Sequence, residues 1–371
     1  MVRLTFAVAA ACLATVAMVE VGTRGLVGTE VIDLARPHSD DELYWRSDHP
    51  TFGVWHAPNA SWVHRSKCFK VKYTSNSVGA RDIERSRRAA GPRVAVLGDS
   101  FFEGWGVVAH QRMSNRLEAI TGVPHLNFAM AHFGPYQQLI AYETLVSDFD
   151  HDAVIASIVP INDFEDTDYD LARSTVGYRF MYRPYLVGDP PHLEHLDVRE
   201  NTARRWLRQR SYAFNVVLPL IDQRRAGRFE DARAASIARV GDPPSRFYDY
   251  ADAAALRLEI ILAGLAKAVG ERPLAVLLVP TRPDLLRFRS DGVSPLERRL
   301  VEAGARDGYS VVDLLPPMAE RVTEVDRYFF PCDYHWNSFA NEVAAEQVAE
   351  ALGGTFFGGR ARGAVRSEPA A

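Results

Sequence analysis

The sequence RVAVLGDSFFEG, residues 93–104, combines a strand with a turn that can carry a reactive group. Val94–Leu97 is an uninterrupted apolar run rich in β-formers, which is typical of a buried parallel strand. Ser100 follows in a turn flanked by Gly98 and Gly104, and these glycines allow a tight turn and close approach of the backbone. Open α/β sheets place their reactive groups at the carboxyl ends of strands. Ser100 is therefore a candidate nucleophile, and the alternative is an ordinary helix N-cap.

Apolar runs of this kind recur and alternate with helical segments. The predicted strands are Val94–Leu97, Leu126–Met130, Ala153–Val159, Leu274–Val279 and Val311–Leu315. The predicted helices are Arg112–Ile120, Tyr136–Val146, Ala251–Val269, Pro295–Arg306 and Ser338–Leu352, the last one ended by Gly353 and Gly354. Alternation of strands and helices predicts a parallel sheet covered by helices on both faces. The expected fold class is therefore α/β.

The remaining regions define the expected domain organisation. Residues 25–92 form an irregular lead-in with one edge strand at Lys70–Thr74, and residues 93–357 form the main domain. Residues 358–371, rich in Arg, Gly and Ala, form a disordered tail. Residues 164–245 are too long for an ordinary crossover and are an insertion between the third and fourth strands. This insertion is either a packing subdomain or a substrate wall, with Tyr178, Tyr182, Arg183 and Tyr185 as candidate substrate-binding residues.

Composition limits the classes of function. The chain has 371 residues with 43 Lys and Arg against 47 Asp and Glu, and the net charge of −4 gives no basic field for binding nucleic acid. A hydrophobic content of 47% supports a sizeable core. The three cysteines show no metal-ligand spacing. Cys12 lies in the N-terminal apolar run, so Cys68 and Cys332 are left as a pair that a disulfide can join if the domain is exported.

The N-terminus has the features of an export signal. Arg3 precedes an uncharged apolar stretch, residues 4–19, which approaches the roughly 20 residues that a membrane span needs. We favour an uncleaved signal anchor that tethers the chain to the inner membrane through residues 4–21, and the alternative is a cleaved signal peptide within residues 1–24. Either interpretation places the rest of the chain in the cell envelope, as a periplasmic or otherwise extracytoplasmic domain.

A serine nucleophile needs a base and a group that orients the base. The sequence PCDYHWN, residues 331–337, places Asp333 two residues before His335 in a loop that follows the fifth strand. This spacing lets one loop present the carboxylate to one imidazole nitrogen while the other nitrogen faces Ser100. The alternative is a helix-entry loop in which Asp or Asn acts as a cap.

Donors for an oxyanion are expected at the ends of two further strands. Gly134 follows the second strand, and its N–H can approach a substrate because the residue has no side chain. Asn162 follows the third strand and can donate through its amide. Because the carboxyl ends of parallel strands meet at one edge of the sheet, both are expected to lie near Ser100.

This set of motifs resembles the SGNH hydrolases, the GDSL-like esterases and lipases, over about residues 73–352. GDSF at residues 98–101 matches the first block of that family, Gly134 the second, Asn162 the third, and Asp333 with His335 the last. The chain departs from the family in two places. Proline precedes Ile161 and Asn162 where the third block usually begins with glycine, and one residue rather than two separates the aspartate from the histidine in the last block.

The resemblance implies a flavodoxin-like three-layer α/β/α sandwich. It also implies roles for the motif residues: Ser100 as nucleophile, His335 as base, Asp333 as the group that orients it, and the backbone N–H groups of Ser100 and Gly134 with the Asn162 side chain as the oxyanion hole. Chemistry of this type requires no metal and no organic cofactor. The last block, D-x-H-W-N, is similar to a bacterial subgroup that has an N-terminal membrane helix and is often associated with cell-surface polysaccharide modification.

The function favoured by the sequence is an exported serine esterase that removes O-acetyl or other short acyl groups from a carbohydrate. One alternative is a polysaccharide O-acyltransferase that uses the same residues. Further alternatives are a lipase or thioesterase and a non-catalytic polysaccharide assembly protein. Hydrolysis and transfer differ in whether water or a sugar hydroxyl takes the acyl group, which depends on the exclusion of water and on acceptor binding.

Overall fold

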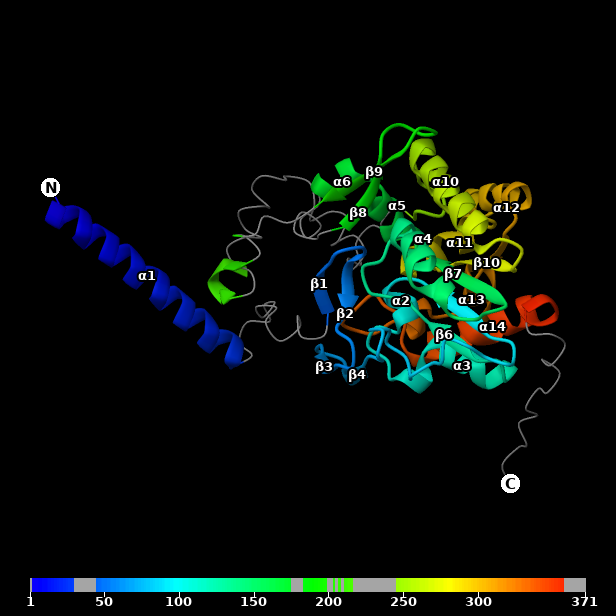
Figure 1. Cartoon of the computed structure of the whole chain (residues 1–371), viewed down its shortest axis with the longest axis horizontal. Coiled ribbons are helices and arrows are strands. Elements are labelled where there is room, and N and C mark those ends of the chain that lie inside the picture. The colour runs from blue at the N-terminus through cyan, green and yellow to red at the C-terminus, as the bar shows by residue number, and fades with distance from the viewer. Residues whose placement is uncertain are drawn as a thin grey trace, which may run out of the picture.

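The structure is a computed structural model that describes residues 2–29, 45–174, 183–198, 203, 206–207, 210–215 and 245–356. Helix α1 (Val2–Gly28) stands away from the main domain, which is built around a central sheet (Figure 1). Within these described residues, no helix combines the length and the hydropathy that crossing a membrane requires.

The central sheet has five parallel strands in the order β11-β10-β7-β5-β6. The strands are β5 (Val94–Leu97), β6 (His125–Asn127), β7 (Ala153–Ile158), β10 (Leu274–Leu278) and β11 (Ser310–Asp313). They coincide with the five predicted runs, so the prediction of an α/β fold with a five-stranded parallel sheet is confirmed. Every residue of β5, β7 and β10 is buried, as expected for strands covered on both faces.

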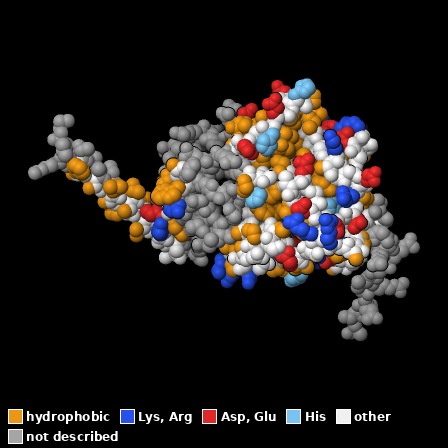
Figure 2. All heavy atoms as spheres, viewed as in Figure 1, with side chains coloured by type: hydrophobic (Ala, Val, Ile, Leu, Met, Phe, Trp, Pro, Cys, Tyr) orange, Lys and Arg blue, Asp and Glu red, His pale blue; other side chains and the backbone are white. Residues whose placement is uncertain are grey.

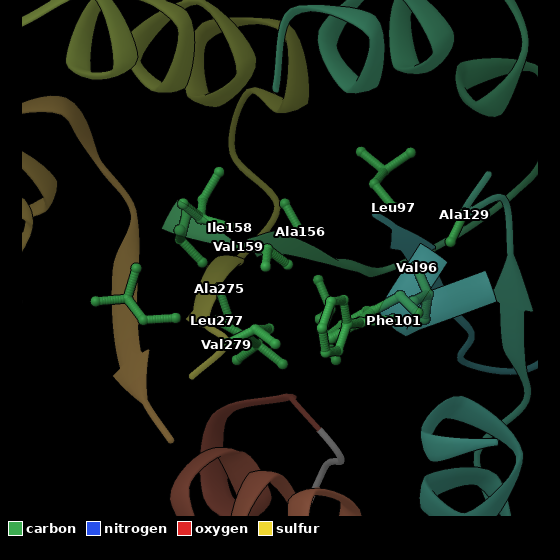
Figure 3. Packing of buried hydrophobic residues seen from close by; sticks show 14 of the residues in the cluster. Val96, Leu97, Phe101, Ala129, Ala156, Ile158, Val159, Ala275, Leu277 and Val279 are labelled. Carbon is green, nitrogen blue, oxygen red and sulfur yellow. The ribbon is translucent and has the colours of Figure 1, made fainter. Parts of the chain in front are cut away.

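Helices cover the sheet on both sides, and the buried side chains lie between these layers (Figure 3). In one layer, helix α10 (Asp252–Val269) packs against three other helices. These are α4 (Pro135–Thr144), α5 (Pro160–Thr167) and α12 (Pro295–Asp307). The second group packs around α14: α3 (Met113–Thr121), α11 (Arg282–Asp291), α13 (Leu315–Arg321) and α14 (Ser338–Phe356). Short 3₁₀ turns occur at Ala109–Gln111, Val146–Asp148 and Val325–Tyr328.

The last helix does not end where the glycine pair predicts. It continues through Gly353 to Phe356. Phe356 is buried in the hydrophobic core, and its burial compensates for the low helix propensity of the preceding glycines. The prediction that Gly353 and Gly354 end the helix is therefore wrong.

The lead-in is more regular than expected. It contains two antiparallel hairpins, β1 (Trp45–His49) with β2 (Gly53–His56), and β3 (Ser61–Arg65) with β4 (Lys70–Thr74). The strand predicted at Lys70–Thr74 is present, but it pairs with β3 in a separate sheet and not with the central one. The turn of this hairpin carries Cys68, which forms a disulfide with Cys332. The pairing that the sequence left open is thus made.

The insertion begins with α6 (Tyr169–Ser174) and an antiparallel hairpin of β8 (Arg183–Val187) and β9 (Glu194–Val198). Strand β8 packs against α4 and α5, the helices that follow β6 and β7. The hairpin therefore lies over the side of the sheet where these helices begin. Much of the remaining insertion and the tail at residues 358–371 lie outside the described residues.

Candidate active site

The nucleophile turn is formed by close packing between neighbouring strands. Helix α2 (Ser100–Glu103) follows β5, and Asp99 caps it by accepting a hydrogen bond of 3.0 Å from the N–H of Phe101. A side chain at position 98 would come within 2.7 Å of the Phe102 Cβ and would also meet the Ser157 hydroxyl on β7. Only glycine fits there, and this close approach holds Ser100 at the carboxyl end of β5.

Ser100, His335 and Asp333 form a hydrogen-bonded triad. The Ser100 Oγ lies 2.7 Å from His335 Nε2, and His335 Nδ1 lies 2.5 Å from Asp333 Oδ1. Ser100 and His335 are 8% and 5% exposed, so the proton path is shielded from bulk water. Burial raises the pKa of Asp333, but its hydrogen bonds with His335, the charge of that residue and a bond from Trp105 outweigh burial and lower the pKa overall. The carboxylate therefore stays ionised and can stabilise an imidazolium.

Each residue around the histidine has a defined part in shaping its loop. The backbone N–H of His335 donates to Asp333 Oδ1 at 3.0 Å, so the aspartate fixes both the loop and the ring. Trp336 is fully buried and donates to the carbonyl of Pro280, just after β10. Asn337 accepts hydrogen bonds from the N–H groups at positions 339 and 340 and thereby caps α14.

The two further oxyanion donors follow β6 and β7 as predicted, but both have partners within the protein. The N–H of Gly134 donates to Gln137 Oε1 at 3.0 Å within the capping box of α4. Asn162 Nδ2 donates to Asp99 Oδ2 at 3.2 Å. Asn162 therefore lies beside the nucleophile turn, and its donor faces the residue before Ser100. The role of both residues as oxyanion donors stays a prediction.

Behind these donors lie buried carboxyl groups. Burial raises the pKa of Asp99 to about 6, although hydrogen bonds from Asn162 and the Phe101 N–H oppose the shift. Burial and the charges of Asp99 and Asp166 raise the pKa of Asp163 well above its usual value. Burial and the neighbouring negative charges thus favour the protonated form of Asp163.

Glu103 is a supporting residue that the motif comparison missed. It is completely buried in α2, where Oε1 lies 3.1 Å from His56 Nε2 and Oε2 accepts a 2.5 Å hydrogen bond from the N–H of Ala131. Burial opposes its ionisation, but His56, Arg81 and the Ala131 N–H lower its pKa to about 2. Glu103 thus fixes the loop that leads to Gly134. The signal in the sequence was a charged residue directly after two phenylalanines, Phe101 and Phe102.

The predicted substrate wall is only partly described. Tyr178 and Tyr182 lie outside the described residues. Arg183 and Tyr185 are 1% and 3% exposed, and Arg183 pairs with Asp166 and donates to the carbonyl of His132. In this arrangement Arg183 fastens the insertion to α5 and to the loop before α4, and its burial does not support direct contact with a substrate.

No group of three His, Cys, Asp or Glu side chains in the described part of the chain is placed to hold a metal ion. What the geometry does define is a class of protein: an α/β protein with a serine, histidine and aspartate assembled for acyl chemistry at the carboxyl edge of its sheet.

Comparison with known proteins supports this class. Residues 272–371 match the family model described as "SGNH hydrolase-like domain, acetyltransferase AlgX", and this range includes Asp333 and His335. No curated protein matches the chain in sequence.

Several solved structures are similar in outline. They include a lipase/acylhydrolase from Enterococcus faecalis (12% identity, 71% of this chain, 96% of that chain, TM-score 0.37). A second is TesA (13% identity, 70% of this chain, 97% of that chain, TM-score 0.39). A third is a lipolytic protein of the G-D-S-L family from Veillonella parvula (10% identity, 71% of this chain, 99% of that chain, TM-score 0.37). Likeness at this level says nothing about the reaction.

Proposed function

We propose that this chain is a serine acyltransferase that moves a short acyl group, most simply acetyl, to a hydroxyl of a carbohydrate. The observation that carries the proposal is the continuous hydrogen-bonded path from Asp333 through His335 to Ser100. The match of residues 272–371 to a family described as an acetyltransferase favours transfer over hydrolysis. This reverses the order that the sequence alone favoured.

The proposed reaction has two halves. Ser100 Oγ attacks the carbonyl of the donor ester while His335 Nε2 takes the serine proton. The tetrahedral intermediate collapses, the leaving alkoxide takes that proton, and Ser100 is left acylated. A carbohydrate hydroxyl then gives its proton to His335 and attacks the acyl carbonyl, and the proton returns to Ser100 as the ester product leaves.

Negative charge develops on the carbonyl oxygen in both halves. The N–H groups of Ser100 and Gly134 and the Asn162 amide are the proposed donors to it. Since Gly134 and Asn162 already have acceptors, the oxyanion must compete with Gln137 and Asp99 for them. A full negative charge is a stronger acceptor than a neutral amide oxygen, which favours the exchange at Gly134.

An esterase is the second candidate, because water can take the place of the carbohydrate hydroxyl in the second half-reaction. The triad serves both reactions equally. A lipase or thioesterase would need an apolar channel for a longer acyl chain, and a non-catalytic assembly protein would not need the triad.

The proposed location is the cell envelope. The disulfide between Cys68 and Cys332 suits an oxidising compartment. Helix α1 carries exposed apolar side chains along its length, among them Phe6, Leu13 and Val16 (Figure 2). We include a membrane tether through residues 4–21 in the proposal. Recovery of the protein in the soluble fraction with a new N-terminus, after expression of the full chain, would contradict the tether.

The reaction is tested with 4-nitrophenyl acetate as donor, with and without an oligosaccharide acceptor. We expect acetylated oligosaccharide as the main product and an acetyl group on Ser100 in intact-protein mass spectra. Ser100→Ala should lower the rate by about 10⁴-fold or more. Equal rates for both proteins would refute the nucleophile, and release of acetate alone at saturating acceptor would favour the esterase.

A further inference from the structure

Trp105 contacts both the acid and the base of the triad, although no motif of the sequence marked it. Its indole Nε1 donates to Asp333 Oδ2 at 3.0 Å, while His335 uses the other oxygen, Oδ1. Its ring stacks on the imidazole of His335 with 5.0 Å between centroids and 24° between planes. One side chain therefore limits the rotation of the carboxylate and the tilt of the base.

Two further aromatic rings contact the imidazole of His335. Tyr334 stacks on His335 at 4.3 Å and 27°. Phe101, the residue after the nucleophile, lies 4.9 Å from the same imidazole at 43°. Aromatic faces attract a cation, so these rings favour the imidazolium that forms when His335 takes a proton.

Trp105 is itself held in place by the hairpin of the lead-in. His64 on β3 meets the indole edge-on at 4.3 Å and 81°, and His64 Nδ1 lies 3.1 Å from the hydroxyl of Tyr73 on β4. That hydroxyl accepts a 2.8 Å hydrogen bond from the N–H of Gly106, in the same turn as Trp105. The β3–β4 hairpin and the triad therefore both fix the position of the indole.

We propose that Trp105 is a positioning residue of the triad. It donates to the Asp333 oxygen that His335 does not use and stacks on the His335 ring, so that the base contacts Ser100 in one orientation. This role rests on the proposed acyl transfer for its purpose but on the contacts above for its geometry. In both half-reactions His335 takes up the proton and gives it back, and Asp333 remains a carboxylate throughout.

The effect of removing the indole N–H on the pKa of Asp333 has a predictable sign. Asp333 would lose a donor that lowers its pKa, so the Asp333–His335 pair would bind its proton more tightly. The other titratable groups that face this pair are the carboxyl of Asp99 from the β5–α2 turn, the hydroxyl of Tyr334, His64 on β3 and Tyr73 on β4. A substitution at position 105 replaces none of these groups, although His64 loses its edge-on contact with the indole.

The experiment compares Trp105→Phe with Trp55→Phe in the full chain. Both variants keep a ring and lose one indole hydrogen bond, since Trp55 Nε1 donates to the carbonyl of Val78 at 2.9 Å, away from the triad. NMR of ring-labelled histidine, assigned with His335→Gln, follows the titration of His335. We expect its midpoint to move by about half a pH unit or more in Trp105→Phe and not in Trp55→Phe.

A kinetic measurement gives a second readout. Trp105→Phe should lower kcat about tenfold with little change in KM, and it should have no further effect when Asp333 is already Asn. An unchanged His335 titration, or an equal shift in Trp55→Phe, would overturn the proposal. A shifted titration in a protein whose Ser100 never becomes acylated would instead refute the proposed function and leave the role of Trp105 standing.

Discussion

The two sides of the site differ in how their polar groups are engaged. On the base side, Asp333 receives hydrogen bonds from Trp105 and from His335, and His335 already contacts Ser100. On the oxyanion side, Gly134 and Asn162 donate to groups of the protein itself. The base side is assembled before any substrate arrives, whereas the oxyanion side has to exchange partners.

This difference between the two sides determines where substrate binding energy is needed to align the catalytic groups. A group that is already aligned costs nothing to align in the transition state, and this is the basis of electrostatic preorganisation. A donor that must first break a hydrogen bond within the protein stabilises the transition state only by the difference in free energy between the two hydrogen bonds. Substitutions on the base side should therefore have larger effects than substitutions on the oxyanion side.

The largest effect is expected for Asp333→Asn. An amide at this position cannot stabilise the imidazolium and favours the wrong tautomer of His335, so kcat should fall by about 10⁴-fold. Steady-state kinetics with 4-nitrophenyl acetate measures the effect. Asp326→Asn is the control, because Asp326 pairs with Arg282 on the surface and should retain full activity. A loss of kcat smaller than about tenfold would contradict the conclusion that the base side is assembled in advance.

A smaller loss is expected for Asn162→Ala. Removal of one oxyanion donor typically lowers kcat by about 10²–10³-fold, and competition from Asp99 should bring the loss to the lower end of this range. The matched control is Asn341→Ala, a buried asparagine that joins α14 to the start of α3 and should affect stability alone. Equal kinetics for Asn162→Ala and the native chain would remove Asn162 from the oxyanion hole.

The disulfide should contribute to the base side mainly through stability. Cys332 directly precedes Asp333, and its bond to Cys68 ties the loop to the β3–β4 hairpin. The double variant Cys68→Ser with Cys332→Ser should lose about 2–5 kcal/mol of unfolding free energy, measured by urea denaturation. Dithiothreitol should destabilise the native chain by a similar amount and leave the double variant unaffected. A native chain insensitive to the reductant would contradict this prediction.

The last prediction concerns the pH dependence of stability on the oxyanion side. Asp99 has a pKa of about 6 in the folded chain against a usual 3.8, so the folded state keeps a proton that the unfolded state releases. Stability should therefore fall as pH rises from about 4 to about 6, by about 3 kcal/mol from this residue. Asp99→Asn should make that decline in the Tm shallower. Glu103→Gln should not, because the pKa of Glu103 lies near 2. A native slope in Asp99→Asn would contradict the prediction.

Much of the fold and the triad could be predicted because their signals are local. The strand at Val94–Leu97 and the turn after it are readable from contiguous residues, and the ends of parallel strands necessarily meet at one edge. The support of the site could not be predicted in this way. Trp105 and Asp333 are 228 positions apart and meet only because the chain folds, and β3 pairs with β4 without a strong pattern of alternation. The extent of the last helix depended on where Phe356 packs.

The bond between Cys68 and Cys332 also has a topological consequence. It spans 264 positions, so that the whole central sheet lies inside one covalent ring. A single protease cut anywhere in that ring, for example in the exposed turn between β8 and β9, opens the ring without releasing a fragment. The piece that carries Ser100 and the piece that carries His335 would remain one molecule until a reductant separates them.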